Sequence, residues 1–231
     1  MRSVLPRLEA PPIRRVLAAR DVAAAEWVAL AFFVYLGILG LIWRVTVVQR
    51  ILLLSVPVAL CMAWRVRVAS RCKYASIVKQ WSSLSLILVG YWLLQCFASG
   101  SEIPWEQEWL RWDRSVLYEA GLHFAIEKGG SILPSLLEQV YLLLYAIPAV
   151  CLGLIYQFGA GSRADRFLLV LFLGTFSAYA LLPWFQVRSP RVAFPGEDLP
   201  HFVGFAREVN TWLLDHADIS TSVFPSGHVA V

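Results

Sequence analysis

The feature that most constrains the fold is a series of long apolar stretches. Each is near or above the roughly 20 residues that a helix needs to cross about 30 Å of hydrocarbon. They cover residues 27–43, 47–64, 82–98, 131–158 and 167–187, and a sixth begins near Phe224. Only helices and closed barrels satisfy the backbone in lipid, and these stretches lack the alternation of barrel strands. We therefore expect an all-α, polytopic transmembrane helical bundle with about five spans and the start of a sixth.

The composition excludes an ordinary soluble domain. Hydrophobic residues make up 58% of the chain and charged residues 16%, whereas soluble domains have roughly 45–50% and about 25%. Such a chain does not have enough polar residues to cover an apolar core in water. The bilayer is therefore its expected partner.

The basic residues predict the orientation, because short cytoplasmic loops carry the excess of Lys and Arg. Twelve of them flank the apolar stretches on one side: Arg2, Arg7, Arg14, Arg15, Arg20, Arg65, Arg67, Arg71, Lys73, Lys79, Arg163 and Arg166. The loops 99–130 and 188–222 instead hold six and five acidic residues against three basic residues each. We expect a cytoplasmic N-terminus and two outer loops, so that the net charge of +4 reflects topology and nucleic acid is not a partner.

The predicted segments follow from this topology. They are a cytoplasmic tail (1–26), three transmembrane helices (27–98), an outer loop (99–130) and a second membrane domain (131–231). Within the outer loop, apolar residues recur at helical spacing: Trp105, Trp109, Trp112 and Val116. Tryptophan favours the headgroup zone, which predicts an extracytoplasmic amphipathic helix at the membrane interface.

The most informative motif is Pro-Ser-Gly-His, residues 225–228. At ordinary residue frequencies, only about one in a thousand chains of this length should contain this motif by chance. Proline suits a first helical turn and glycine lets a ligand approach the backbone, so free N–H groups at a helix start would face an anion. His228 would stand beside that anion and exchange a proton near neutral pH.

These residues resemble the middle signature of the type 2 phosphatidic acid phosphatase superfamily. The resemblance implies that His228 is a catalytic residue that protonates the leaving group, and that Ser226 and Gly227 bind phosphate. The usual upstream signature is Lys-x6-Arg-Pro, but here Pro190 precedes Arg191 and Trp184 occupies the lysine position.

The upstream pattern is more similar to inositol-phosphoceramide synthases and related inositol phosphotransferases. Tyr179, Pro183 and the Pro190-Arg191 pair carry this likeness. It implies that Arg191 binds phosphate, with Arg188 as a second candidate. The third signature, Ser-Arg-x5-His-x3-Asp, would supply a nucleophilic histidine and does not occur in residues 1–231. The resemblance therefore implies that residues 131–231 are a truncated phosphatase-like membrane domain, and we expect the chain to be a C-terminally truncated fragment that is inactive alone.

The expected function is that of a lipid phosphatase or phosphotransferase at the outer face of a bacterial inner (plasma) membrane. It would act through a phosphohistidine on a lipid-linked phosphate and need neither a metal nor another cofactor, because arginine forks and helix-start amides neutralise the charge. Alternatives are a phosphatase of polyprenyl diphosphate or phosphatidic acid, and a non-catalytic transporter or scaffold.

Three other residues have open roles. Glu138 lies inside the fourth apolar stretch, where an ionisable group is either functional or a paired structural carboxylate. His201 and His216 lie in the second outer loop near Asp198, Asp215 and Asp218. A metal site there is conceivable, but no ligand spacing repeats, which favours solvated loop residues.

Overall fold

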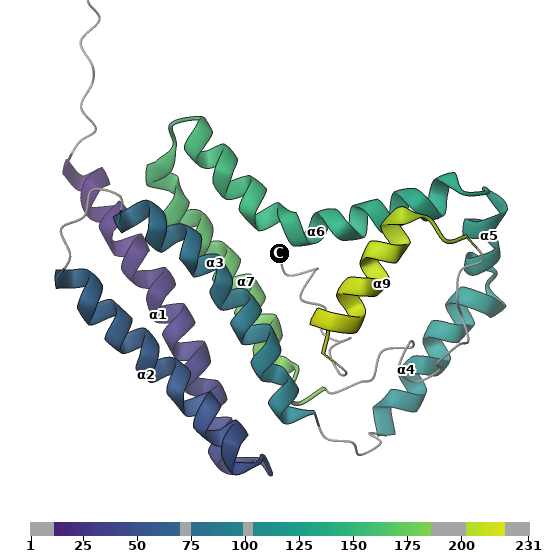
Figure 1. Cartoon of the computed structure of the whole chain (residues 1–231), viewed down its shortest axis with the longest axis horizontal. Coiled ribbons are helices and arrows are strands. Elements are labelled where there is room, and N and C mark those ends of the chain that lie inside the picture. The colour runs from purple at the N-terminus through teal and green to yellow at the C-terminus, as the bar shows by residue number, and fades with distance from the viewer. Residues whose placement is uncertain (1–11, 70–74, 99–103, 186–201, 220–231) are drawn as a thin grey trace, which may run out of the picture.

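The described part of the chain is helical. The computed structural model describes residues 12–69, 75–98, 104–185 and 202–219, and within these ranges there is no β-strand (Figure 1). The α-helices are α1 (Pro12–Ile42), α2 (Val47–Ala69), α3 (Ala75–Leu94), α4 (Pro104–Arg114), α5 (Leu122–Lys128), α6 (Ile132–Gln157), α7 (Ala164–Leu181) and α9 (Phe205–Ala217). Short turns of other helix types follow α3, α4 and α6: η1 (Gln95–Phe97), η2 (Ser115–Glu119) and η3 (Gly161–Arg163).

Four helices are long and apolar enough to cross a membrane. Their spans are Ala24–Ile42, Ile77–Phe97, Ile132–Gln157 and Gly161–Leu181. The helical prediction is thus confirmed for these four stretches. In the second stretch the apolar part, Val47–Ala63, is shorter than a full span. The stretch near Phe224 lies outside the described residues.

The bundle core lies between α1, α3 and α7, which run side by side in the same direction (Figure 1). Phe32 of α1 stacks on Phe176 of α7 with ring centroids 4.4 Å apart and an interplanar angle of 8°. Gly90 lets α3 approach these rings, because a Cβ atom there would lie 2.9 Å from Phe32 and 3.3 Å from Phe176. Small residues at such contacts are what helix packing in lipid requires, since there is no hydrophobic driving force between helices.

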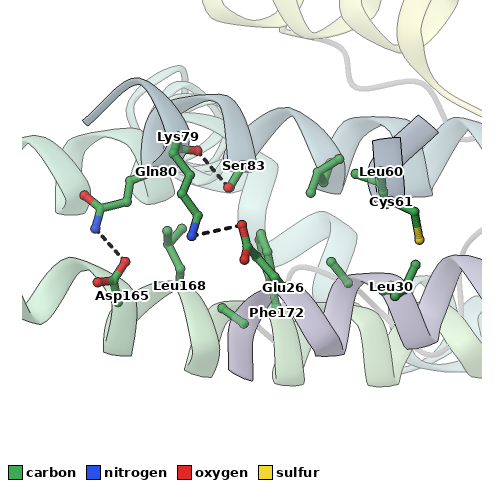
Figure 2. A pocket seen from close by; sticks show the side chains of 13 residues that line it. Glu26, Leu30, Leu60, Cys61, Lys79, Gln80, Ser83, Asp165, Leu168 and Phe172 are labelled. Atoms are coloured by element: carbon green, nitrogen blue, oxygen red, sulfur yellow. Dashed lines mark hydrogen bonds and ion pairs between the residues drawn. The ribbon is translucent and has the colours of Figure 1, made fainter. Parts of the chain in front are cut away.

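One end of this bundle holds a polar cluster, shown in Figure 2. Lys79 of α3 forms an ion pair with Glu26 of α1 at 2.9 Å, and Gln80 donates a hydrogen bond to Asp165 of α7 at 2.5 Å (Figure 2). Tyr156 of α6 donates to Gln80. The cluster joins four helices at the end near the loop that follows α2. Each charged group has an opposite or hydrogen-bonding partner, as polar groups at the edge of lipid require.

A second group of elements lies to the side of the bundle. Helix α6 is bent and reaches from the bundle to α5, and α9 lies against its first half (Figure 1). Pro148 lies inside α6, where its ring removes a backbone hydrogen bond and favours such a bend. A short helix, α4, lies within residues 99–130, and its Trp112 is 68% exposed.

Candidate functional site

The residues expected to bind phosphate, and the expected catalytic histidine, lie outside the described part of the chain. They are Arg188, Arg191, Ser226, Gly227 and His228. The described residues closest to them in sequence are Phe185 after α7 and Ile219 after α9. The contacts around Phe185 and Ile219 therefore determine where the chain enters the two segments that contain these residues.

The flank after α7 is tied to α1. Tyr35 donates a hydrogen bond to the carbonyl of Ala180 at 2.7 Å, and the Trp184 indole donates to the Tyr35 hydroxyl at 2.7 Å. The last carbonyls of a helix have no partner inside the helix, so Tyr35 satisfies one of them. Trp184 also contacts Trp43, with ring centroids 4.9 Å apart. The chain leaves α7 in a fixed position.

The flank after α9 is tied to α3. Tyr91 donates a hydrogen bond to the carboxylate of Asp218, and the Trp92 indole donates to the carbonyl of Ala217 at 2.9 Å. Ile219 is buried, 6% exposed, in the core that α1, α3 and α7 form. We expected Asp218 to be a solvated loop residue. In the structure its carboxylate instead accepts a hydrogen bond from Tyr91.

The two flanks meet at one end of the bundle. The Tyr91 and Tyr179 rings lie 5.9 Å apart and join α3 to the last turn of α7. We call this group, Tyr35, Tyr91, Tyr179, Trp184 and Asp218, the carboxyl-end junction. It lies at the opposite end of α3 from Lys79 and Gln80.

Glu138 is paired in the structure. Its Oε1 accepts a hydrogen bond from Nη1 of Arg207 at 2.8 Å, and Asn210 Nδ2 donates both to Oε2 and, at 3.1 Å, to the Glu138 carbonyl. Asn210 is 1% exposed. These contacts fasten α9 to α6. Of the two roles open for Glu138, the paired carboxylate is the one observed.

The other histidines have separate surroundings. His216 is exposed, stacks on Trp212 with ring centroids 4.9 Å apart, and has its Nδ1 2.8 Å from the Trp212 carbonyl oxygen. His123 of α5 lies 3.4 Å from Glu127. His201 is outside the described residues. Within the described ranges, no group of three or more His, Cys, Asp or Glu side chains could hold a metal ion.

Sequence reasoning missed Tyr35, Tyr91, Arg207 and Asn210. The two tyrosines lie in apolar stretches, where an aromatic residue is ordinary core material and only the hydroxyl marks a polar contact. Arg207 and Asn210 lie on α9, which was not expected within the loop 188–222. Its signal is an amphipathic pattern in which Phe205, Val209 and Trp212 recur at helical spacing.

No protein-family model matches the chain, and no curated protein or solved structure matches it.

Proposed function

We propose that the chain forms the membrane part of an enzyme that removes or transfers a phosphoryl group from a lipid-linked phosphate. The observation that carries the proposal is the Pro-Ser-Gly-His motif at residues 225–228 of a chain with four helices of membrane-spanning length. In this proposal Arg191 and Arg188 bind phosphate oxygens. Ser226 and Gly227 offer hydroxyl and backbone N–H donors at a helix start.

The carboxyl-end junction supports bringing these residues together. Arg188 follows Phe185 by three residues, a reach of about 11 Å for an extended chain, and Ser226 follows Ile219 by seven, a reach of about 25 Å. Both starting points are held by aromatic and hydrogen-bonding contacts at the same end of the bundle. A phosphate near that end is within reach of both segments.

The chemistry has two steps. A histidine nucleophile of the kind that the resemblance implies attacks phosphorus; an N–P bond forms and the P–O bond to the lipid breaks. His228 gives its proton to the departing alkoxide. Water or an inositol-like alcohol then attacks phosphorus, the N–P bond breaks, and the proton of the attacking hydroxyl passes to His228. Arginine and backbone donors stabilise the negative charge throughout.

The site is proposed to face the outside of a plasma membrane. The described basic residues Lys79, Arg163 and Arg166 lie at the opposite end of the bundle, where α3 and α7 begin and where the Lys79–Glu26 pair lies. With that end in the cytoplasm, the carboxyl-end junction, α4 and α5 lie outside. Helix α2 then provides a fifth span, and residues from Phe224 onward begin a sixth.

The test uses the full-length gene product in detergent or nanodiscs with phosphatidic acid as substrate. His228→Ala should lower phosphate release by about a hundredfold or more, the usual scale for loss of a general acid. His216→Ala is the matched control, because His216 is exposed and stacks on Trp212. It should release phosphate at the wild-type rate. Equal rates for the wild type and His228→Ala would refute the assigned role.

A further inference from the structure

A groove separate from the carboxyl-end junction lies between α5, α6 and the start of α9. Its volume is about 570 Å³, within the range of about 300–1,000 Å³ that is usual for small-molecule sites. Most of its wall is apolar: Ile126, Leu137, Leu142, Phe202 and Phe205. Such a wall suits a hydrocarbon chain.

The groove adjoins the face that α6 presents to its surroundings. Only 6% of the apolar window of α6 is buried, and the exposed residues include Leu136, Val140 and Leu143. In a membrane these side chains contact lipid tails. A lipid can therefore enter the groove sideways from the bilayer and keep its tails in an apolar environment throughout.

Arg207 supplies the polar contact in this groove. Both carboxylate oxygens of Glu138 are occupied, one by Arg207 Nη1 and the other by Asn210. A guanidinium has five N–H donors, and among the described residues Arg207 makes its hydrogen bond through Nη1 alone. Its Nε and Nη2 donors are available to a ligand. The group that complements these donors is a hydrogen-bond acceptor such as a phosphate oxygen.

We infer that this groove binds the lipid phosphate substrate, with Arg207 on the phosphate and the acyl chain along the apolar wall. Glu138 is a positioning residue that orients the guanidinium, and Asn210 fixes Glu138. The identity of the lipid as substrate rests on the proposed function; the binding itself does not. Arg207 would receive the lipid from the bilayer before its phosphate reaches Arg191 and His228.

The experiment measures binding without turnover. The full-length protein in phosphatidylcholine nanodiscs is titrated with phosphatidic acid that carries a photoactivatable group in its acyl chain. After illumination, the label should lie in peptides of α5, the first half of α6 and residues 202–217. Arg207→Ala should weaken labelling about tenfold, because a charge-assisted hydrogen bond is lost. Arg111→Ala is the matched control, since Arg111 is exposed and pairs with Glu108 on α4; it should label like the wild type.

Further arms identify the ligand and guard against misfolding. Ser135→Trp fills the groove without altering Arg207 and should abolish labelling. Diacylglycerol with the same photoactivatable chain should not label the groove, and millimolar glycerol phosphate should not compete. Labelling that survives both Arg207→Ala and Ser135→Trp would overturn the inference, as would equal labelling by diacylglycerol or efficient competition by glycerol phosphate.

The same samples separate this inference from the proposed function. His228→Ala should lose phosphate release and keep groove labelling. Labelling without any phosphate release by the wild type would refute the proposed enzyme and leave the groove as a lipid site. Phosphate release without groove labelling would refute the groove alone.

Discussion

Tyr91 joins the elements around the carboxyl-end junction more directly than the other described residues. Its hydroxyl donates to Asp218 and its ring contacts Tyr179. The backbone N–H of Ile219 lies 3.5 Å from the same hydroxyl oxygen. Tyr91 therefore fixes the point from which the chain continues toward Ser226 and His228.

We predict that Tyr91→Phe lowers phosphate release about two- to tenfold, the loss expected from one hydrogen bond worth about 0.5–1.5 kcal/mol. The matched variant is Tyr156→Phe, which loses its hydrogen bond to Gln80 at the opposite end of the bundle. Both variants should melt a few degrees below the wild type, since about 1 kcal/mol corresponds to roughly 2–4 °C for a chain of this size. A Tyr156→Phe variant that loses as much activity as Tyr91→Phe would show that the junction has no special role.

Single residues also mark what the sequence could and could not predict. Glu138 stood out because an ionisable group in an apolar stretch requires a partner, but the partner lies 69 positions away and follows from tertiary packing. Asp218 was expected in solvent, but the contacts of the end of α9 with Tyr91 and Trp92 of α3 bring it to the Tyr91 hydroxyl. Arg188, Arg191, Ser226, Gly227 and His228 remain predictions from the motif, because they lie outside the described residues.

At the scale of helices, the long apolar stretches predicted the elements well because lipid leaves the backbone few alternatives. The structure differs from this prediction at the start of α1 and at α9. Helix α1 begins at Pro12, 15 residues before the first apolar stretch, and proline is favourable at a helix start. Helix α9 is amphipathic and contains charged residues, so a search for apolar runs does not find it.

Gly90 lets α3 approach α1 and α7 closely, and this close packing can be tested by substitution. Gly90→Ala should lower the melting temperature by several degrees, since its Cβ atom would lie 2.9 Å from the Phe32 ring and overpacking costs about 1–3 kcal/mol. Gly153→Ala is the control within another apolar helix, because the nearest side-chain atom, on the Trp81 ring, would be 3.9 Å away. This variant should melt at or above the wild-type temperature, as alanine is about 1 kcal/mol better than glycine in a helix. Equal melting of both variants in a fluorescence-monitored thermal scan would contradict the packing of α3 on α1 and α7.

For the whole molecule, the two ends of the bundle have different chemistry. One end holds the pairs Lys79–Glu26 and Gln80–Asp165 near the basic loops. The other end holds the carboxyl-end junction, after which the chain continues into the two segments that we propose to bind phosphate. The proposed function requires these ends to lie on opposite sides of the membrane, with the phosphate chemistry outside.

The most direct test of this account measures the side on which phosphate is released. Sealed right-side-out and inside-out membrane vesicles containing the full-length protein are supplied from outside with a water-soluble, short-chain phosphatidic acid. Right-side-out vesicles should release phosphate at once, and inside-out vesicles only after permeabilisation; His228→Ala should be about a hundredfold slower or worse in both. Release by intact inside-out vesicles, or no release by either preparation after permeabilisation, would contradict the account.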